Sequence, residues 1–307
     1  MASDTAKYDI DIPHDNPRVL AFVQLFTTGL KNYLQDGLSR GARFLPMIRQ
    51  VFQEEGVPLD LAYVPLVESA FKVNAFSRTK AKGLWQFMQA TGRENGLRTD
   101  WYIDERSEPE KATRAAAKYL KTLYGMFSDW SLALASYNAG PGTVQNAIKR
   151  SHGVRDFWEL AANRRNFRQE TRDYVPLIMA ATIIAKNPVQ YGLDVPAAQE
   201  DPRFETVRVS SVVDLRRVAE WADVPVEAIQ VLNPELRRWT TPVRADEYVL
   251  RVPEGKADLV SQRLADAADE TSLNWHTVRK GETLASDRKS TRLNSSHTDI
   301  SRMPSSA

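Results

Sequence analysis

The sequence contains no cysteine, which excludes several kinds of chemistry. Without a thiol the 307 residues can form no disulfide, no thiolate metal site, no cysteine nucleophile and no lipid-modified cysteine. Long apolar runs are also missing, since the most apolar stretch, 175–185, is too short and too interrupted to span a bilayer. Residues 1–7 lack the apolar segment of a signal peptide. We therefore expect either a cytoplasmic protein or a chain whose targeting segment lies upstream.

Net charge is nearly absent as well. The formal charge is +2, and residues 286–307 alone carry an excess of two positive charges, so the rest of the chain is neutral. A neutral body offers no electrostatic reason to bind nucleic acid or an anionic membrane. The four histidines are scattered without the paired spacing of metal ligands, so we expect neither a metal nor a cofactor. They are His14, His152, His276 and His297.

What the chain does contain, up to residue 187, is helical periodicity. Leu20, Val23 and Phe26 lie on one stripe, and the apolar residues between 44 and 52 repeat that spacing. Ser107 and Glu110 have the spacing of a capping box in front of a helix expected at 112–126. No alternating apolar run is convincing before residue 203. We predict a mainly α protein whose first domain is all-α and large enough for its own core.

The pattern changes after a proline-rich segment, which predicts a linker that few contacts cross. Beyond it a strand, two short helices and a second strand follow one another, so we predict a small α+β module of βααβ order. A similar unit begins later and stops, and the serine-rich end has no apolar period with which to bury a core, so we interpret that end as a non-native tail. The predicted divisions are an N-terminal extension at 1–15, the helical domain at 16–187, a linker at 188–202, the module at 203–255, a linker at 256–274, the incomplete unit at 275–285 and the tail at 286–307.

Four short blocks in the helical region carry residues suited to chemistry. Glu68 ends the apolar run 61–67, and desolvation raises the pKa of such a carboxyl toward the range of a general acid, although most glutamates at helix ends are simply solvated. The block 83–88 joins a glycine, apolar side chains suited to a sugar face and an amide, or alternatively serves core packing. The blocks 136–142 and 171–175 contain tyrosines, and taken alone they indicate a helix end and a helix start.

In this order and spacing, Glu68-Ser, Gly-Leu-x-Gln, Tyr-Asn-Ala-Gly and a later tyrosine resemble the soluble-lytic-transglycosylase family, which has a lysozyme-like fold. The segment 57–69 is similar to the membrane-bound lytic transglycosylase D branch, and the resemblance covers about 15–285. It implies that Glu68 is the catalytic acid/base. It further implies substrate contacts or cleft positions for Ser77, Gln86, Met88, Tyr137 and Asn138, and a tyrosine that orients the glutamate, Tyr174. Trp85 departs from the family, where many relatives carry methionine.

The α+β module resembles a LysM domain, a unit that binds N-acetylglucosamine polymers. Residues 231–236 carry this resemblance, and 276–284 resemble the opening of a second copy. The first copy lacks the Gly-Asp/Glu-Thr-Leu opening, which leaves its binding ability open.

The resemblance implies cleavage of the β-1,4 bond between N-acetylmuramic acid and N-acetylglucosamine in peptidoglycan, with 1,6-anhydromuramic ends as products. Glu68 would be the single acid/base, and we interpret Asp100, Asp104 and Glu105 as a solvated loop. Two alternatives stay open: a lysozyme-type hydrolase of the same fold, and a non-enzymatic LysM wall-binding protein. The implied partner is the glycan strand, bound by a monomer in the periplasm or cell envelope, with association to the outer membrane through a segment upstream.

Overall fold

The computed structural model describes residues 7–194, 202–242 and 247–268, so the predicted unit at 275–285 and the tail at 286–307 lie outside the described residues. Helices dominate, and a two-stranded sheet follows them, which confirms the mainly α fold class with a small α+β module. The first part contains α1 (Pro17–Thr27), α2 (Lys31–Gly41), α3 (Leu45–Glu55), η1 (Leu59–Tyr63), α4 (Val64–Ser69), α5 (Gln89–Glu94), η2 (Glu105–Ser107), α6 (Pro109–Phe127), α7 (Trp130–Ala139), α8 (Pro141–Arg150), α9 (Phe157–Ala162), α10 (Gln169–Lys186) and η3 (Pro188–Tyr191).

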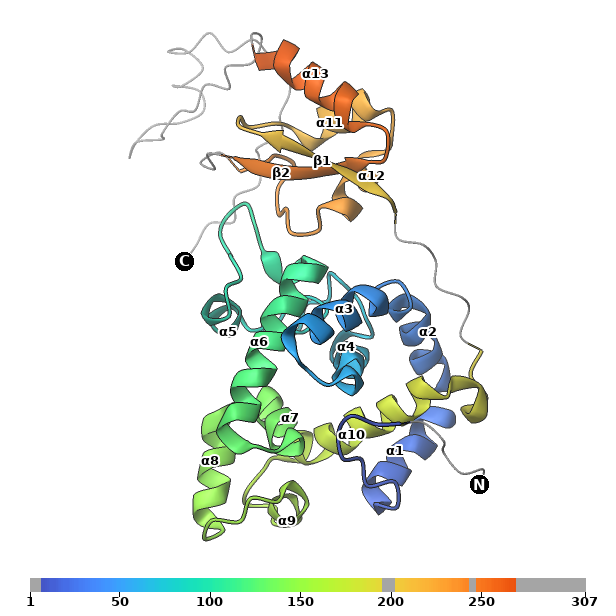
Figure 1. Ribbon diagram of the computed structural model, residues 1–307, viewed down its shortest axis with the longest axis vertical. Helices are drawn as coiled ribbons and strands as arrows, with labels where there is room; N and C mark the ends of the chain where they lie inside the picture. The colour runs from blue at the N-terminus through green and yellow to red at the C-terminus, as the bar shows by residue number, and fades with distance from the viewer. Residues whose placement is uncertain (1–6, 195–201, 243–246, 269–307) are drawn as a thin grey trace. The chain divides into compact units, whose positions relative to one another are not determined.

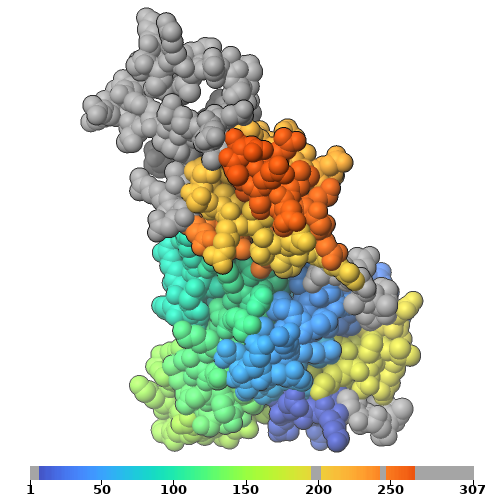
Figure 2. Space-filling view, turned by 45° about the horizontal axis from the view of Figure 1, so that its top comes forward, coloured from blue at the N-terminus to red at the C-terminus, as the bar shows by residue number. Residues whose placement is uncertain are grey.

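The helical domain closes by packing its last long helix against its first. α10 lies beside α1 and contacts α7, while α6 packs between α3 and α7 (Figure 1). In α6 the buried residues Ala112, Ala116, Leu120 and Leu123 recur every three or four positions, so one stripe of the helix faces the core. In the space-filling view the blue N-terminal helices meet the green helices directly (Figure 2).

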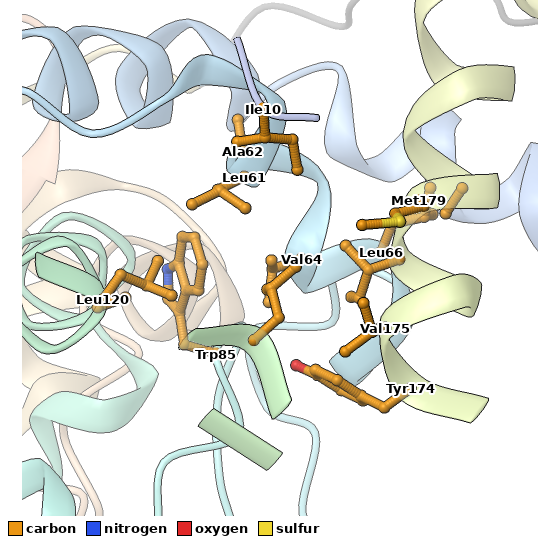
Figure 3. Close-up of a cluster of buried hydrophobic side chains, with 14 of the residues drawn as sticks. Ile10, Leu61, Ala62, Val64, Leu66, Trp85, Leu120, Tyr174, Val175 and Met179 are labelled. Carbon is orange, nitrogen blue, oxygen red and sulfur yellow. The ribbon is translucent and has the colours of Figure 1, made fainter. Parts of the chain in front are cut away.

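The core of the helical domain includes residues next to Glu68 and residues of the block 83–88. Figure 3 shows Trp85 beside Leu120 and Val175 of α10 beside Leu66 of α4, while the Tyr174 ring points from α10 into the space below Val64. Trp85 is fully buried, and its indole N–H donates to the Thr113 hydroxyl at 3.0 Å, which satisfies the one polar group of the ring. The tryptophan that departs from the resembled family is therefore a core residue.

Residues before α1, which we predicted to be part of an extension, pack on the helical domain. Ile10 and Ile12 are each 5% exposed and belong to the same core. The buried carboxylate of Asp60 accepts the backbone N–H of Ile10 at 3.0 Å and pairs with the ammonium group of Lys186. The start of the domain is thus tied to its last helix through one buried ion pair.

The second part confirms the predicted βααβ order. It contains β1 (Phe204–Val209), α11 (Leu215–Ala222), α12 (Val226–Leu232), β2 (Tyr248–Pro253) and α13 (Ala257–Ala268). The strands are antiparallel with Phe204 opposite Pro253, and Val207 and Leu250 face the module core. α13 lies in the predicted linker 256–274, yet Val260 is fully buried in the module core. The module therefore continues past the predicted end at residue 255, because this helix carries an apolar face.

The prediction that few contacts join the helical domain to the module was also too low. The described residues up to Asp266 belong to one compact unit, in which Leu236 forms an antiparallel bridge with Ile103. The Arg251 guanidinium pairs with the Glu108 carboxylate at 2.6 Å, and the Glu108 side chain is only 2% exposed. A linker pattern describes only its own residues, so it could not show a bridge and an ion pair formed by distant ones.

Replacing Arg251 with methionine is expected to lower the free energy of unfolding by about 2 kcal/mol. The change leaves the buried Glu108 carboxylate without its cation, and the partial exposure of Arg251 reduces the loss below that of a fully buried pair. The control is Arg203→Met, which breaks an exposed pair with Glu254 and should change stability by less than about 0.5 kcal/mol. Urea unfolding measures both, and equal losses would mean that burial of Glu108 does not matter.

Candidate active site

Glu68 lies in the last turn of α4, a helix of six residues. The helix begins directly after η1, and Pro65 in its first turn needs no N–H partner there. It ends in a reversal, because Ala70 and Phe71 both adopt left-handed conformations with φ of 49° and 57°. Each non-glycine residue in that region costs roughly 1–2 kcal/mol. Neighbouring groups must therefore hold this turn, and with it the end of the helix that carries Glu68.

Hydrogen bonds tie the loop 83–88 to α4 and to α7. The Ser69 hydroxyl donates to the Leu84 carbonyl at 2.9 Å, and the Tyr137 hydroxyl donates to the Trp85 carbonyl at 2.8 Å. Gly83 has φ of 85°, and a Cβ placed on it would lie 1.7 Å from the Arg106 carbonyl oxygen. The glycine is therefore required for both its conformation and its close approach to the backbone of another segment.

Tyr174 reaches the catalytic candidate from α10. Its hydroxyl lies 2.5 Å from Oε1 of Glu68, to which it donates a hydrogen bond across 106 residues of sequence. Tyr174 is 6% exposed, and Glu68 is half-buried. The two residues predicted to work as a pair thus stand in direct contact.

The acidity of Glu68 is strongly shifted. Burial raises its pKa to about 7, the hydrogen bond from Tyr174 opposes that rise, and the negative charge of Glu170 adds to it. Burial, and next the charge of Glu68, raise the pKa values of Tyr174 and Tyr137 well above that of an ordinary phenol. Near neutral pH the site therefore holds a carboxyl poised to give up its proton beside two phenols that keep theirs.

Glu170 is a contributor that the sequence blocks did not single out. It lies in the first turn of α10, four residues before Tyr174, so both side chains project from the same face of the helix. This i, i+4 spacing was the available signal, but it becomes informative only once Tyr174 is known to face Glu68.

Replacing Glu170 with glutamine is expected to lower the pKa of Glu68. The alkaline side of the activity profile should then move to lower pH, with a rate at pH 8 reduced roughly two- to threefold and a rate at pH 5 unchanged. Glu159→Gln is the matched control, since Glu159 is also an exposed glutamate in the first turn of a helix, α9. Identical profiles for both variants would show that the charge of Glu170 does not reach Glu68.

The remaining predicted site residues are held by their own segments. The Ser77 hydroxyl lies 2.9 Å from that of Thr79, and the Gln86 amide nitrogen donates to the Gly83 carbonyl at 2.8 Å. Asn138 accepts a hydrogen bond from Thr171 at 2.8 Å, which joins the ends of α7 and α10. Met88 is 45% exposed at the end of the loop 83–88. None of the hydrogen bonds described for these residues reaches the Glu68 carboxyl group, so their part in the site stays a prediction.

Our interpretation of the acidic loop was wrong for Asp104. Asp104 is 3% exposed, with the Arg106 guanidinium at 2.9 Å and the Lys82 ammonium at 3.3 Å. Burial raises the pKa of Asp104, but Arg106 and Lys82 outweigh burial and hold that pKa below its ordinary value. The same guanidinium donates to the Phe87 carbonyl at 3.0 Å. Asp104 therefore stays ionised and supports the loop 83–88 through Arg106, which is a structural task rather than proton transfer.

The capping box is also formed differently from the prediction. Glu108, not Ser107, is the N-cap of α6, and its carboxylate accepts the backbone N–H of Lys111. Ser107 is used earlier, as the buried last residue of η2. Glu108 thus joins the start of α6 to Arg251 of the module.

The comparison with protein families matches residues 47–159 to the transglycosylase SLT domain, which spans Glu68 and the blocks around residues 86 and 137. This chain carries an SLT domain. Residues 203–269 match the LysM-like domain of lytic transglycosylase MltD, which agrees with a module that includes α13. Both matches confirm the family resemblance drawn from the sequence blocks.

Curated relatives are also similar to the chain. Membrane-bound lytic murein transglycosylase D of Escherichia coli (strain K12) is 34% identical over 272 residues, covering 83% of this chain and 59% of the relative. The chain thus spans less than two thirds of that relative's length. Peptidoglycan transglycosylase gp16 of Escherichia phage T7 is 34% identical over 140 residues, covering 45% of this chain and 11% of the phage protein.

Two solved structures resemble parts of the chain. The 70 kDa soluble lytic transglycosylase of Escherichia coli has 23% identity and a TM-score of 0.41, covering 47% of this chain and 24% of that one. An inactive mutant of lytic transglycosylase Slt from Pseudomonas aeruginosa has 25% identity and a TM-score of 0.40, covering 50% of this chain and 24% of that one.

Among the residues that the structure describes, no helix is long and apolar enough to cross a bilayer. No three acidic or histidine side chains of these residues are grouped so that they could hold a metal ion.

Proposed function

We propose that this protein is a lytic transglycosylase that cleaves the β-1,4 bond between N-acetylmuramic acid and N-acetylglucosamine in peptidoglycan. The observation that carries the proposal is the Glu68 carboxyl, whose pKa is raised to about 7 and which accepts a hydrogen bond from Tyr174 inside an SLT domain. A carboxyl with this pKa can donate a proton near neutral pH and take one back, as general acid–base catalysis requires.

Glu68 performs both proton transfers in this mechanism. As a neutral acid it protonates the glycosidic oxygen, while the acetamido group of the muramic residue stabilises the positive charge that develops at C1. As a carboxylate it then accepts the proton of the muramic C6 hydroxyl, whose oxygen attacks C1. The product is a 1,6-anhydromuramic end, formed without water.

Tyr174 supports the second half of this cycle. A hydrogen bond to an ionised carboxylate is stronger than one to a neutral acid, so the phenol stabilises Glu68 after it has released its proton. It also fixes the direction of one carboxyl oxygen, which leaves the other oxygen for the substrate. Tyr174 is therefore a positioning residue whose effect appears in the rate rather than in substrate affinity.

We assign sugar binding to the other predicted site residues. Met88 offers an exposed apolar surface to a sugar face, and the side chains of Ser77, Gln86 and Asn138 carry the polar groups that hydroxyl and acetamido groups pair with. Tyr137 holds the backbone of the loop 83–88 through its hydrogen bond to the Trp85 carbonyl. These assignments follow the family resemblance and the position of the loop beside α4.

A lysozyme-type hydrolase is the second candidate, and Glu170 is the observation that favours it. Its charge acts on Glu68, so a second carboxylate stands near the acid, as in glycosidases that activate water. Digestion of purified peptidoglycan followed by mass analysis of the fragments separates the two mechanisms. Fragments lighter by one water than hydrolysis products support transglycosylation, and fragments of the hydrolysis mass refute it.

The setting of the reaction is the cell envelope, where peptidoglycan is found. The 34% identity to a membrane-bound lytic murein transglycosylase supports this location, and the LysM-like match supports retention on the wall by the second part. If the protein only bound the wall, a suspension of cell walls would keep its turbidity after the protein is added. Loss of turbidity would exclude the hypothesis of a non-enzymatic wall-binding protein.

A further inference from the structure

The helix α2 approaches the end of α4 unusually closely. A Cβ added to Gly37 would lie 2.6 Å from Cδ1 of Leu66, and one added to Gly41 would lie 2.5 Å from the ring of Phe71. Both glycines lie on one face of α2, four residues apart, where larger side chains would separate the two helices. The absence of side chains there brings the α2 backbone against the turn that follows Glu68.

Arg40 lies on α2 directly before Gly41 and spans this contact. Its Nε donates to the Ala70 carbonyl at 2.9 Å. The N–H groups of the same turn are bound by α4 itself, since Ala70 donates to the Leu66 carbonyl and Phe71 to the Pro65 carbonyl, both at 3.1 Å. The N–H groups of the left-handed turn thus bind carbonyls of α4, and the Ala70 carbonyl of the same turn binds Arg40 of α2.

We propose that Arg40 is a positioning residue for catalysis, which fixes the left-handed turn at Ala70 and Phe71 and thereby aims Glu68 at Tyr174. The proposal rests on the function proposed above. A residue thirty positions before Ala70 controls the catalytic acid through a backbone carbonyl, without touching the substrate or the carboxyl group.

The charged and titratable groups that act on Glu68 come from two other helices. They are Tyr174 and Glu170 on α10 and Tyr137 on α7. The positive charge of Arg40 acts instead on Tyr33, on the same helix. Removing Arg40 therefore affects Glu68 through the geometry of the turn rather than through the loss of a charge beside the acid.

The test compares Arg40→Met with Arg40→Lys, which keeps a donor, and with Arg155→Met as a matched control. Arg155 likewise donates to backbone carbonyls, those of Met126 and Phe127 at 3.1 and 3.3 Å, at the end of α6. Two measurements are made on the full chain: kcat and KM against pH on soluble glycan strands, and the titration of the Glu68 carboxyl by ¹³C NMR without substrate. The Glu68 signal is identified by its absence in Glu68→Gln.

Arg40→Met should lower kcat about 10- to 100-fold with little change in KM, because the acid is misplaced rather than the substrate. The Glu68 titration should move to lower pH, since a carboxyl turned away from its apolar surroundings is better hydrated. Arg40→Lys should restore part of both effects. Arg155→Met should lower the melting temperature and leave both measurements unchanged.

The proposal would be overturned if Arg40→Met kept the wild-type Glu68 titration and the wild-type kcat and differed only by a lower melting temperature. If Arg40→Met does not fold, Arg40→Lys decides, because wild-type values of both quantities there would also overturn it. A wild-type protein that does not cleave peptidoglycan would refute the proposed function, whereas the NMR titration would still show whether Arg40 positions Glu68.

Discussion

Glu68→Gln is expected to abolish peptidoglycan cleavage while leaving the fold intact. The amide keeps the shape of the carboxyl and its contact with Tyr174, but it cannot donate a proton or accept one back. General acid–base catalysis contributes roughly 10²–10⁴-fold in rate, and the proposed mechanism uses Glu68 in both proton transfers, so the loss should reach the upper part of this range. Release of soluble muropeptides from purified sacculi measures the effect.

The control for this experiment is Glu54→Gln, which removes an exposed carboxylate from α3 and should leave the rate unchanged. Stability supplies a second check. The folded protein keeps the proton of Glu68 up to about pH 7, whereas the unfolded chain releases it near 4.5, so the wild type loses stability as the pH rises between these values. Glutamine cannot titrate, and the variant should escape this loss of roughly 3 kcal/mol. Substantial cleavage by a folded Glu68→Gln would mean that another group is the acid.

Gly83→Ala is expected to destabilise the protein severely, more than Gly96→Ala. The added Cβ would lie 1.7 Å from the Arg106 carbonyl oxygen. The backbone fixes the position of the Cβ and the oxygen is itself a backbone atom, so no side-chain rotation can relieve the clash. The carbonyl belongs to the residue that pairs with buried Asp104, which leaves the segment little room to shift. We expect a loss of more than about 4 kcal/mol, or failure to fold, measured by thermal and urea unfolding.

Gly96→Ala is the matched control for conformational strain. Gly96 also has a positive φ, 96°, but a Cβ there meets no atom within 4 Å. It should lose only the roughly 1–2 kcal/mol that the left-handed conformation costs an alanine. Equal losses in the two variants would show that the approach of Gly83 to the Arg106 carbonyl is not tight.

The sequence predicted the helical domain, the βααβ module and the pairing of Glu68 with Tyr174, because each of these leaves a local pattern or a family motif. The buried state of Asp104 left none, since a run of Asp, Glu and Arg has the composition of a solvated loop until Lys82 is folded against it. The spacing of Asp104 and Arg106 was a signal only in hindsight. A polar pair is buried by its three-dimensional partners rather than by its neighbours in sequence.

Other contributors were missed for a similar reason. Glu170 became relevant only through the face of α10 that it shares with Tyr174, and Ile10 and Ile12 lie in a short segment without periodicity. Such residues act through contacts that join distant parts of the chain. Patterns within a window of ten or fifteen residues cannot reveal them.

The pairing of α1 with α10 also determines when the active site exists during synthesis. The chain leaves the ribosome from its N-terminus, and the core stays incomplete until residues near Lys186 have emerged to pair with Asp60. Tyr174 lies on that same last helix, 106 residues after Glu68. A growing or partly folded chain therefore has a solvated glutamate of ordinary acidity in place of a poised acid. The wall cleavage proposed above would therefore begin only after the helical domain has finished folding.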